Sequence, residues 1–487
     1  NDAVTVLSQL ADTEEDAGRK AKYWAGVATL QQKYLKDNYN AVRSFDKALD
    51  ADPTMLKAFQ AIDQILTQDR DYERQDRYYR KMLKRATEVG LDDQLVFSLA
   101  KNLGEINRSR LQRYEEALKA YKIALTKKPD DAGIHQIMAQ LYEMEDRVDK
   151  AIAQHYKLIE LDPRQTESYQ NLRRLFMEAG KYDEAWCVCQ VLTYLGAANQ
   201  DERVFFEKYR SRTLTQARRP LDKQHWALIN HPEKSVLLDH LFQRLYPFLL
   251  PLMTTQLKDL RLNKRKHLIE ANEQTPFNNV LTYTAQITRL NRLDVYRDPE
   301  GRAGIRSAPL NPPAMIVGSD ITSGPKLQEL AFICSKQLYL MGQHHFLATI
   351  DENYEARKTR LLSSIYALMK LVNPQTQVQA DPALLEELAR MGIPQTELTE
   401  MTKLIQKMSQ NPQQHLNVSK WLEMTEHSAN RLGVLLANDI SAAIQVVKNE
   451  QGQFSKAPTP ERVREIVLFG LSPAYFELRK ALGLAIG

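Results

Sequence analysis

A period of 34 residues organises the N-terminal part of the chain and restricts its fold more than any other feature. Ala117, Ala151 and Ala185 follow one another at two intervals of 34, and Pro129 and Pro163 repeat with the same spacing. Each alanine is followed by a larger residue four positions later and by alanine or leucine seven positions later, which places all three on one helical face. The prolines come five residues further on, where a helix must end. The spacing predicts repeated helix pairs.

Weaker copies of the pattern extend the repeat toward the N-terminus. They are Ala41, Phe45, Ala48 and Pro53, and, more loosely, Gln75, Tyr79 and Met82. Ala41 and Ala117 are 76 residues apart, eight more than two periods, so we expect lengthened loops near residues 88–91 or 108–113. Residues 2–22 are interpreted as the second helix of a repeat whose first helix is missing. We predict four to five repeats in residues 1–200.

The pattern resembles the tetratricopeptide repeat, whose second helix carries small, aromatic and small residues before a proline. In the unit that begins near residue 132, the family's Leu, Gly and Tyr positions are taken by Met138, Ala139 and Tyr142. The next unit has Leu172, Arg173 and Phe176 there, and Arg173 departs from the small residue. The resemblance implies an α-solenoid whose concave face, lined by the first helices, binds peptides.

Five polar residues are expected on that inner face. They are Gln136, Gln140, Gln170, Asn171 and Arg174. Four amides and one cation can hydrogen-bond an extended peptide or its carboxylate. The other interpretation is that these residues are the ordinary polar surface of solvated helices.

Composition restricts the class of protein further. The chain has only 18 glycines in 487 residues, which favours a mainly helical fold. Its longest apolar run, residues 245–253, contains two prolines and is far shorter than the roughly 20 residues of a membrane span. Three cysteines form neither a disulfide framework nor a zinc site, so we expect a reducing, cytoplasmic location, without a cofactor.

Two basic clusters stand out against a net charge of only +5. The first consists of Lys208, Arg210, Arg212, Arg218, Arg219 and Lys223, and the second of Lys264, Arg265 and Lys266. Such clusters suit phosphate or an acidic partner, but no aromatic ladder or groove-reading motif accompanies them. We interpret them as an exposed linker and helix face, with an interdomain contact as the intermediate case. Nucleic acid is therefore not the expected partner.

After residue 288 the sequence changes to short apolar segments broken by proline and glycine. Residues 293–296, 304–306 and 314–317 are predicted as short strands. Residues 327–341 follow, with the apolar spacing of a helix that has a wide buried face. The pattern predicts an α+β domain in which a helix packs under a small sheet.

This strand–turn–helix segment resembles the zincin peptidases related to the CAAX prenyl endopeptidase and its HtpX-like bacterial membrane-protease relatives. Those proteins carry Glu-Leu-Ala and then H-E-x-x-H, in which two histidines hold zinc and the glutamate is the general base. Aligning Glu-Leu-Ala at residues 329–331 places the motif on Lys336, Gln337 and Leu340. A cation, a neutral amide and an apolar side chain can neither bind zinc nor activate water.

A second element of the family supplies the third zinc ligand and a supporting aspartate. Residues 425–433 match it, with Glu426 at the ligand position and Asn430 where the aspartate would be. A relocated zinc site can be imagined from His344, His345 and His427, but adjacent helical histidines point about 100° apart. Histidines at the surface near a helix end are the preferred interpretation, and we predict no metal.

The sequence thus predicts three parts: a tetratricopeptide superhelix over residues 1–200, a basic linker or helix over residues 201–226 and a degenerate zincin-like domain over residues 227–487. The predicted function is a non-catalytic scaffold or adaptor, within a larger complex, that binds one or more proteins. The first alternative is an active metallopeptidase with non-standard ligands. The second is a nucleic-acid-associated scaffold acting through the basic clusters.

Overall fold

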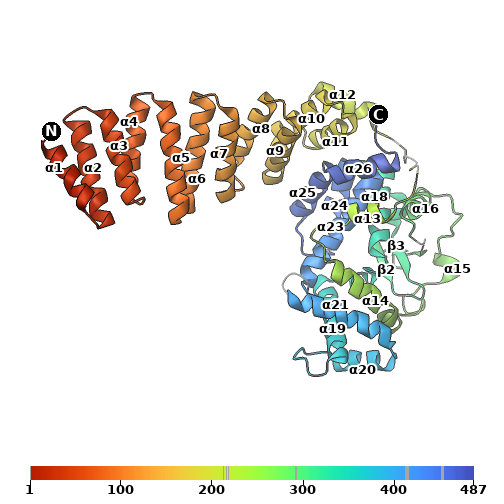
Figure 1. The fold of residues 1–487 in the computed structure, drawn as a ribbon. Coiled ribbons are helices and arrows are strands. Elements are labelled where there is room, and N and C mark those ends of the chain that lie inside the picture. Colours follow the sequence, from red (N-terminus) through yellow and green to blue (C-terminus); the bar gives the residue numbers. More distant parts are fainter. Residues whose placement is uncertain are drawn as a thin grey trace. The chain divides into compact units, whose positions relative to one another are not determined.

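The computed structural model is mainly helical and describes residues 2–211, 213–214, 217, 219–290, 293–411, 416–450 and 454–486 (Figure 1). Its contacts divide the chain into two compact units, Asn1–Asp162 and Pro163–Gly487. Within the described ranges, no helix has both the length and the apolar character needed to cross a membrane.

Consecutive antiparallel helices build the first unit. They are α1 (Asp2–Thr13), α2 (Ala17–Lys33), α3 (Asn38–Ala51), α4 (Leu56–Gln68), α5 (Tyr72–Val89), α6 (Asp93–Glu105), α7 (Tyr114–Lys127), α8 (Ala132–Met144) and α9 (Val148–Leu161). Figure 1 shows them side by side in chain order. Neighbouring helices pack on one another throughout the unit, as α-solenoid repeats do.

The predicted repeat positions form the interior of this stack. Ala41 on α3, Ala117 on α7 and Ala151 on α9 are completely buried. Their partners four residues later, Phe45, Tyr121 and His155, are also buried. The helices end one or two residues before the repeated prolines. The 34-residue period and the helix pairs that it predicted are confirmed.

One close contact explains why a small residue is needed in the first helix of a pair. A Cβ atom on Gly104 of α6 would lie 2.6 Å from the ring of Tyr121 on α7, closer than side chains tolerate. The Tyr121 hydroxyl donates a hydrogen bond to Glu105 Oε2 at 3.1 Å. Glycine therefore allows the aromatic ring of the second helix to lie flat against the first.

The eight extra residues between Ala41 and Ala117 lie in helices, so the predicted lengthened loops are wrong. Helix α5 is 18 residues long, and α6 continues as a π-helix, η1 (Ile106–Arg110). Asn107 at the start of this wide turn is fully buried, and its Nδ2 donates to Leu103 O and to Asp76 Oδ1 at 2.9 and 2.6 Å. This buried amide satisfies groups that a π-turn displaces from the regular helical ladder.

The first helix is shorter than the predicted segment 2–22. Helix α1 ends at Thr13 and α2 begins at Ala17, because Asp16 caps α2 by accepting a hydrogen bond from Arg19 N at 2.8 Å. Residues 17–22 therefore belong to the first complete helix pair, α2–α3.

The second unit contains one more helix pair and a larger mixed region. Its helices are α10 (Thr166–Glu178), α11 (Tyr182–Tyr194), α12 (Gln200–Tyr209), α13 (Lys223–Ile229), α14 (Val236–Met253), α15 (Lys264–His267), α16 (Pro276–Thr288), α17 (Ser319–Ser323), α18 (Leu327–Leu340), the 3-10 helix η2 (Phe346–Thr349), α19 (Tyr354–Val372), α20 (Pro382–Arg390), α21 (Gln395–Gln410), α23 (Val418–Ala437), α24 (Ile440–Asn449), α25 (Thr459–Gly470) and α26 (Pro473–Leu482).

The pair α10–α11 keeps the repeat pattern but packs on the C-terminal region. Ala185, Cys189 and Leu192 on α11 are fully buried, as the period predicts. On the same helix, Asp183 accepts two hydrogen bonds from Arg479 of α26, at 2.7 and 2.8 Å, and Arg479 is completely buried. The compact units therefore divide after residue 162, whereas the predicted division fell after residue 200.

A three-stranded sheet lies in the second half of the chain. Strand β1 (Asp294–Arg297) pairs in parallel with β3 (Ala314–Val317), and β2 (Ile305–Ala308) pairs antiparallel with β3, giving the order β1-β3-β2. The predicted strands and the apolar helix α18 are confirmed, with shifts of one or two residues. At the end of α18, Met341 accepts a hydrogen bond from Ser307 of β2.

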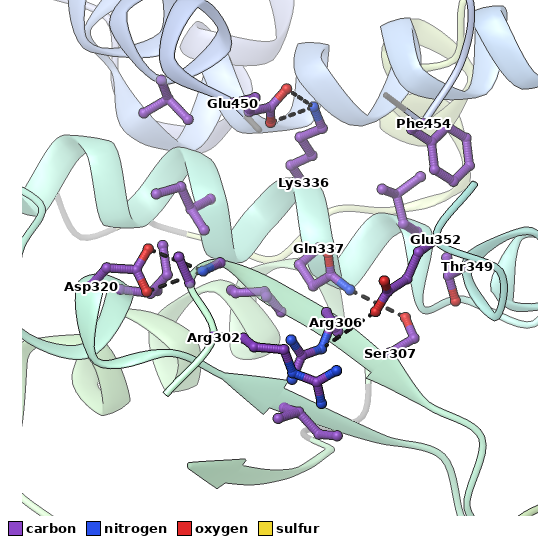
Figure 2. A pocket seen from close by; sticks show the side chains of 18 of the residues that line it. Arg302, Arg306, Ser307, Asp320, Lys336, Gln337, Thr349, Glu352, Glu450 and Phe454 are labelled. Carbon is purple, nitrogen blue, oxygen red and sulfur yellow. Dashed lines mark hydrogen bonds and ion pairs between the residues drawn. The ribbon is translucent and has the colours of Figure 1, made fainter. Parts of the chain in front are cut away.

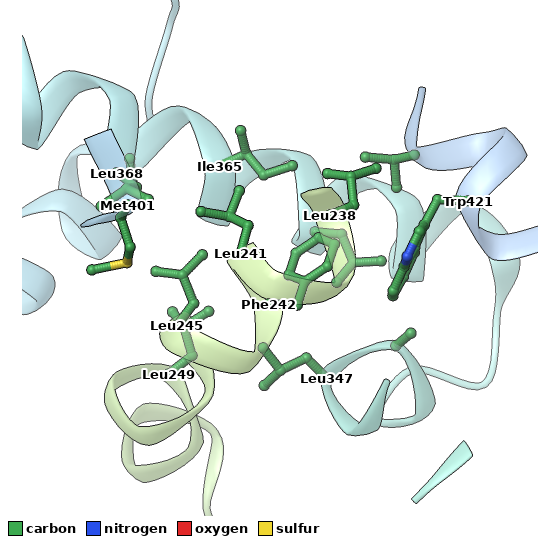
Figure 3. Packing of buried hydrophobic residues seen from close by; sticks show 14 of the residues in the cluster. Leu238, Leu241, Phe242, Leu245, Leu249, Leu347, Ile365, Leu368, Met401 and Trp421 are labelled. Carbon is green, nitrogen blue, oxygen red and sulfur yellow. The ribbon is translucent and has the colours of Figure 1, made fainter. Parts of the chain in front are cut away.

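Apolar side chains from α14, α19, α21 and α23 form a large core in this unit (Figure 3). Leu241 and Phe242 of α14 lie at its centre, between Ile365 of α19 and Trp421 of α23. The Trp421 indole donates a hydrogen bond to Asp239 Oδ1 at 2.8 Å, which satisfies its polar atom inside the core. Most residues of α23 are buried, so this helix lies in the interior of the unit.

Helices α18 and α23 pack closely on each other. A Cβ atom on Gly433 of α23 would lie 2.6 Å from the Phe332 ring of α18. This contact brings the two helix backbones together. It also sets the separation of the polar side chains that α18 and α23 present to the same cleft.

Candidate binding cleft

A cleft of about 920 Å³ opens between β2 and the helices α18 and α24. Strand β2 contributes Ile305, Arg306 and Ser307, and the end of α24 contributes Asn449. Figure 2 shows the outer edge of the small sheet below α18 and the α24 region above it. Among the described strands, none pairs with the edge of β2 that lies away from β3.

Most residues at the degenerate motif positions lie together in this cleft. Lys336, Gln337 and Leu340 of α18 line it, and so does Glu426 of α23, ninety residues further along the chain. Lys336 and Leu340 are four residues apart and share one helical face. The structure therefore brings four of the five predicted positions together. Asn430 lies one turn beyond Glu426, buried at 1% exposure, and does not line the cleft.

A cluster of two cations and two carboxylates fills the place where these positions converge. Lys336 Nζ lies 2.6 and 2.8 Å from the two carboxylate oxygens of Glu450 and 3.5 Å from Glu426 Oε1. Arg462 of α25 donates to Glu426 Oε1 at 3.1 Å and to Glu450 Oε2 at 2.8 Å. The formal charges of the cluster cancel. Figure 2 shows the Lys336 side chain extended toward Glu450.

Both carboxylate oxygens of Glu426 have partners within the fold. Its Oε2 accepts a hydrogen bond from Ser455 Oγ at 2.6 Å, and its Oε1 faces Arg462 and Lys336. Burial disfavours the charged carboxylate, but the attraction of Lys336 and Arg462 outweighs it and lowers the pKa of Glu426 below its usual value. Glu426 is therefore a buried carboxylate held by two cations.

Sequence reasoning found Lys336 and Glu426 but missed Glu450, Ser455 and Arg462. The alignment that identified the motif stopped at the zinc ligands, and these three residues lie beyond its second element. One signal was present: a lysine at a buried position needs acidic partners. Glu450, which follows directly after α24, is such an acid.

The amide Gln337 occupies the motif position of the general base. Its Nε2 lies 3.4 Å from Ser307 Oγ of β2, a contact that links α18 to the edge strand (Figure 2). An amide cannot take up a proton at neutral pH. The position therefore joins helix to strand and offers no base to a water molecule.

The three histidines considered for a relocated metal site lie elsewhere, and their predicted surface position is wrong for two of them. His345 is 6% exposed and His427 2%. His345 Nε2 lies 2.6 Å from Lys234 Nζ, and Lys234 pairs with Asp239 at 2.8 Å. His345 thus belongs to a buried polar group that also includes the Tyr339 hydroxyl, which accepts a hydrogen bond from Lys234 at 3.0 Å. Among the described residues, no group of histidines, cysteines and acids is arranged to hold a metal ion.

The residues predicted to bind a peptide divide between the two compact units. Gln136 and Gln140 lie on α8 of the first unit, whereas Gln170, Asn171 and Arg174 lie on α10 of the second. Gln140 and Gln170 are exposed and the other three are partly buried. Arg174 pairs with Glu178 on its own helix at 3.3 Å. Their role in binding stays a prediction.

Helix α4 carries a second amide pair that the sequence reasoning did not single out. Gln60 and Gln64 are four residues apart, with the same spacing as the pair on α8, and both are exposed. The shared four-residue spacing in the first helix of a repeat was the available signal. The first unit thus presents two amide pairs on its first helices.

The first basic cluster is partly used inside the second unit. Arg210 pairs with Asp439 at 3.0 Å, and Arg219 Nε donates to Ala481 O at 2.8 Å. Arg212 and Arg218 lie outside the described residues. These contacts lie within one compact unit, so the interdomain contact considered as the intermediate case stays a prediction.

No protein-family model matches the chain, and no curated protein matches it. Three similar solved structures are MamA (41-end) from Desulfovibrio magneticus RS-1, YrrB, described as a TPR protein with an unusual peptide-binding site, and the TPR2AB domain of yeast Sti1 in complex with pHSP90. Their identities are 16%, 16% and 13%, with TM-scores of 0.24, 0.25 and 0.19. They cover 39%, 42% and 39% of this chain and 97%, 96% and 86% of their own. At such scores, the solenoid assignment depends on the helix pairs and buried positions described above.

Proposed function

We propose that the chain is a non-catalytic scaffold that binds proteins through its helix pairs and through the cleft of a zincin-like domain without zinc. The observation that carries the proposal is the Lys336 ammonium group, paired with Glu450 and Glu426 where the motif positions converge. A divalent cation there would meet a fixed positive charge and carboxylates that already bind two side-chain cations.

The charge balance of the cluster supports a site that needs no metal. Two buried carboxylates close together repel each other unless cations lie between them, and a zinc ion or two side-chain cations satisfy this need equally in charge. Here Lys336 and Arg462 supply both charges. Because Gln337 is neutral, the cleft also lacks the base that peptide hydrolysis requires at this position.

The shape of the cleft supports a second docking surface for an extended segment. The outer edge of β2 faces the cleft, and an edge strand offers backbone groups to a segment that lies alongside it. Apolar side chains such as Ile333 and Phe454 line the same space. We propose that a partner segment binds there without being cut.

In the first unit, the amide pairs on α4 and α8 support binding of a polypeptide backbone. A glutamine side chain offers one acceptor and two donors, which match the peptide group. Gln136 and Gln140 are the predicted members, and Gln60 and Gln64 extend the surface.

Metal analysis and a peptidase assay on the full chain test the absence of catalysis. We expect no stoichiometric zinc after dialysis and no cleavage of a casein substrate, with or without added zinc. The comparison variants are Glu426→Ala and, as the matched control, Glu352→Ala at the rim of the cleft. One equivalent of zinc, lost together with peptidase activity in Glu426→Ala but not in Glu352→Ala, would show that the chain is an active metallopeptidase.

Partner capture tests the binding role of the first unit. Full-length protein with Gln136→Ala and Gln140→Ala is compared with wild type for recovery of the co-purified chain, identified by mass spectrometry. We expect the affinity for the partner to fall roughly thirty-fold, with a matching loss of recovery, because each of the two lost amides removes about 1 kcal/mol of hydrogen bonding. The control carries Lys122→Ala and Thr126→Ala, two exposed residues four apart on α7. Equal recovery from all three proteins would contradict the proposal.

A further inference from the structure

The segment between α14 and α16, which includes the short helix α15, carries the densest positive charge among the described residues of the second unit. Lys258, Arg261, Lys264, Arg265 and Lys266 lie within nine positions, and all five are exposed. The same stretch contains a single acid, Asp259. Asp259 is engaged locally, since its Oδ2 accepts hydrogen bonds from Gln256 N at 3.1 Å and from Thr255 Oγ1 at 3.2 Å. We name residues 256–267 the basic loop.

Most of these charges are not neutralised. Lys258, Lys264, Arg265 and Lys266 form no ion pair with any part of the chain that the structure describes, while Arg261 pairs with Glu300 at 2.8 Å. Like charges gathered on one surface repel one another and raise the local positive potential. An acidic ligand would relieve that repulsion, so the basic loop favours a negatively charged partner.

The backbone of the basic loop is fixed to the sheet. Just before it, Thr255 N donates to Pro309 O, and just after it, Ile269 N donates to Val295 O, both at 2.8 Å. Leu262 in its middle is buried against Tyr296 and Ile316 of the sheet. The charges are therefore presented from an ordered backbone, which lowers the entropy lost when a partner binds.

The basic loop continues into the cleft. Leu260 of the loop lines the cleft, as does Arg302. Arg261 and Arg302 both contact Glu300, at 2.8 and 3.3 Å. A segment that leaves the cleft beside Arg302 therefore reaches the basic loop at Leu260 and Arg261.

We propose that the basic loop binds an acidic segment of the protein partner whose neighbouring residues occupy the cleft; this inference rests on the proposed docking role of the cleft. Two other anionic ligands fit the observations less well. Among the described residues of the loop, no aromatic or large apolar side chain is exposed. Single-stranded nucleic acid is bound through stacking on aromatic rings, and a membrane surface through inserted apolar groups.

The test measures binding of a fluorescein-labelled oligoglutamate to the full chain by fluorescence anisotropy over a series of salt concentrations. We expect binding that weakens steeply with salt. The variant Lys264→Gln, Arg265→Gln, Lys266→Gln should bind roughly ten-fold more weakly, because each exposed ion pair contributes up to about 1 kcal/mol. The control Arg390→Gln, Lys403→Gln, Lys407→Gln removes the same charge from exposed positions on α20 and α21 and should change the affinity less than roughly two-fold.

Several outcomes would overturn the inference. These are equal affinity in the basic-loop variant and wild type, equal losses in both variants, or tighter loop-dependent binding of oligothymidine or phosphatidylserine vesicles. The last result would assign the loop to nucleic acid or membrane. If the wild-type chain does not bind oligoglutamate through the basic loop, while partner capture and the metal analysis give the expected results, this inference is rejected and the proposed function stands.

Discussion

The second unit contains two groups of basic residues with opposite environments. In the cleft, Lys336 and Arg462 are buried and each contacts two carboxylates. In the basic loop, Lys264 and Arg265 are exposed and pair with none of the residues that the structure describes. A buried cation requires a partner within the fold, whereas an exposed one is satisfied by water and remains available. The first group therefore contributes to stability and the second to recognition.

Removal of the Lys336 charge gives the largest expected effect on stability. Lys336→Met leaves Glu426 and Glu450 with one cation between them, and we expect the free energy of unfolding to fall by about 3 kcal/mol. Urea titration with pulsed hydrogen exchange and mass spectrometry of α18 and α23 measures the loss in the second unit. Peptides from α3 in the first unit serve as the internal reference.

Two further variants separate a charge effect from a packing effect. Adding Glu450→Gln to Lys336→Met should restore a large part of the lost free energy of unfolding. One acid, Glu426, and one cation, Arg462, then remain, and they pair with each other. The exposed counterpart, Lys264→Met, should change the free energy by no more than about 0.5 kcal/mol. If Lys336→Met and Lys264→Met lowered the free energy of unfolding by similar amounts, the buried and exposed groups of cations would not differ in their contribution to stability.

Acid pH should weaken the second unit through a buried neutral histidine. His345 is buried, and burial together with the charge of Lys234 lowers its pKa from 6.5 to about 4. Between these two pKa values, the folded protein binds fewer protons than the unfolded chain. The contribution of His345 to the free energy of unfolding is therefore fully present above pH 6.5 and declines as the pH falls toward 4. From pH 7 to 5 we expect a loss of about 2 kcal/mol from this residue.

Urea titrations at several pH values measure this slope, again with the first unit as reference. His345→Gln keeps an acceptor for Lys234 but does not titrate, and it should flatten the slope. A remaining slope is expected from His231, whose pKa burial and Arg431 lower to about 3. An unchanged slope in His345→Gln would mean that His345 does not contribute.

The sequence predicted what depends on local periodicity and missed what depends on distant pairs. The 34-residue period identified the buried alanines, because helical positions repeat regularly. Lys336 and Glu426 were identified from the resemblance to the zincin motif elements. Arg479 and Asp183 are 296 residues apart, and no local pattern connects them. The same applies to His345 and Lys234, whose contact turned an expected surface residue into a buried one.

The extra length between two repeats shows a different limit. The period measured eight additional residues correctly, but spacing does not distinguish a loop from a longer helix. The buried Asn107 amide favours a π-helix, because its hydrogen bonds to Leu103 and Asp76 stabilise the wide turn. The π-helix therefore depends on Asp76 of the neighbouring helix α5, and the spacing of the repeat does not predict this contact.

A cation that belongs to a side chain differs from a bound ion in one practical respect: it cannot dissociate. The ammonium group of Lys336 is present as soon as the chain is made, independent of zinc supply, chelators or metal-delivery proteins. On the proposed function, the cleft keeps its shape in a zinc-starved cell. A partner that binds there would find the site assembled at any metal concentration.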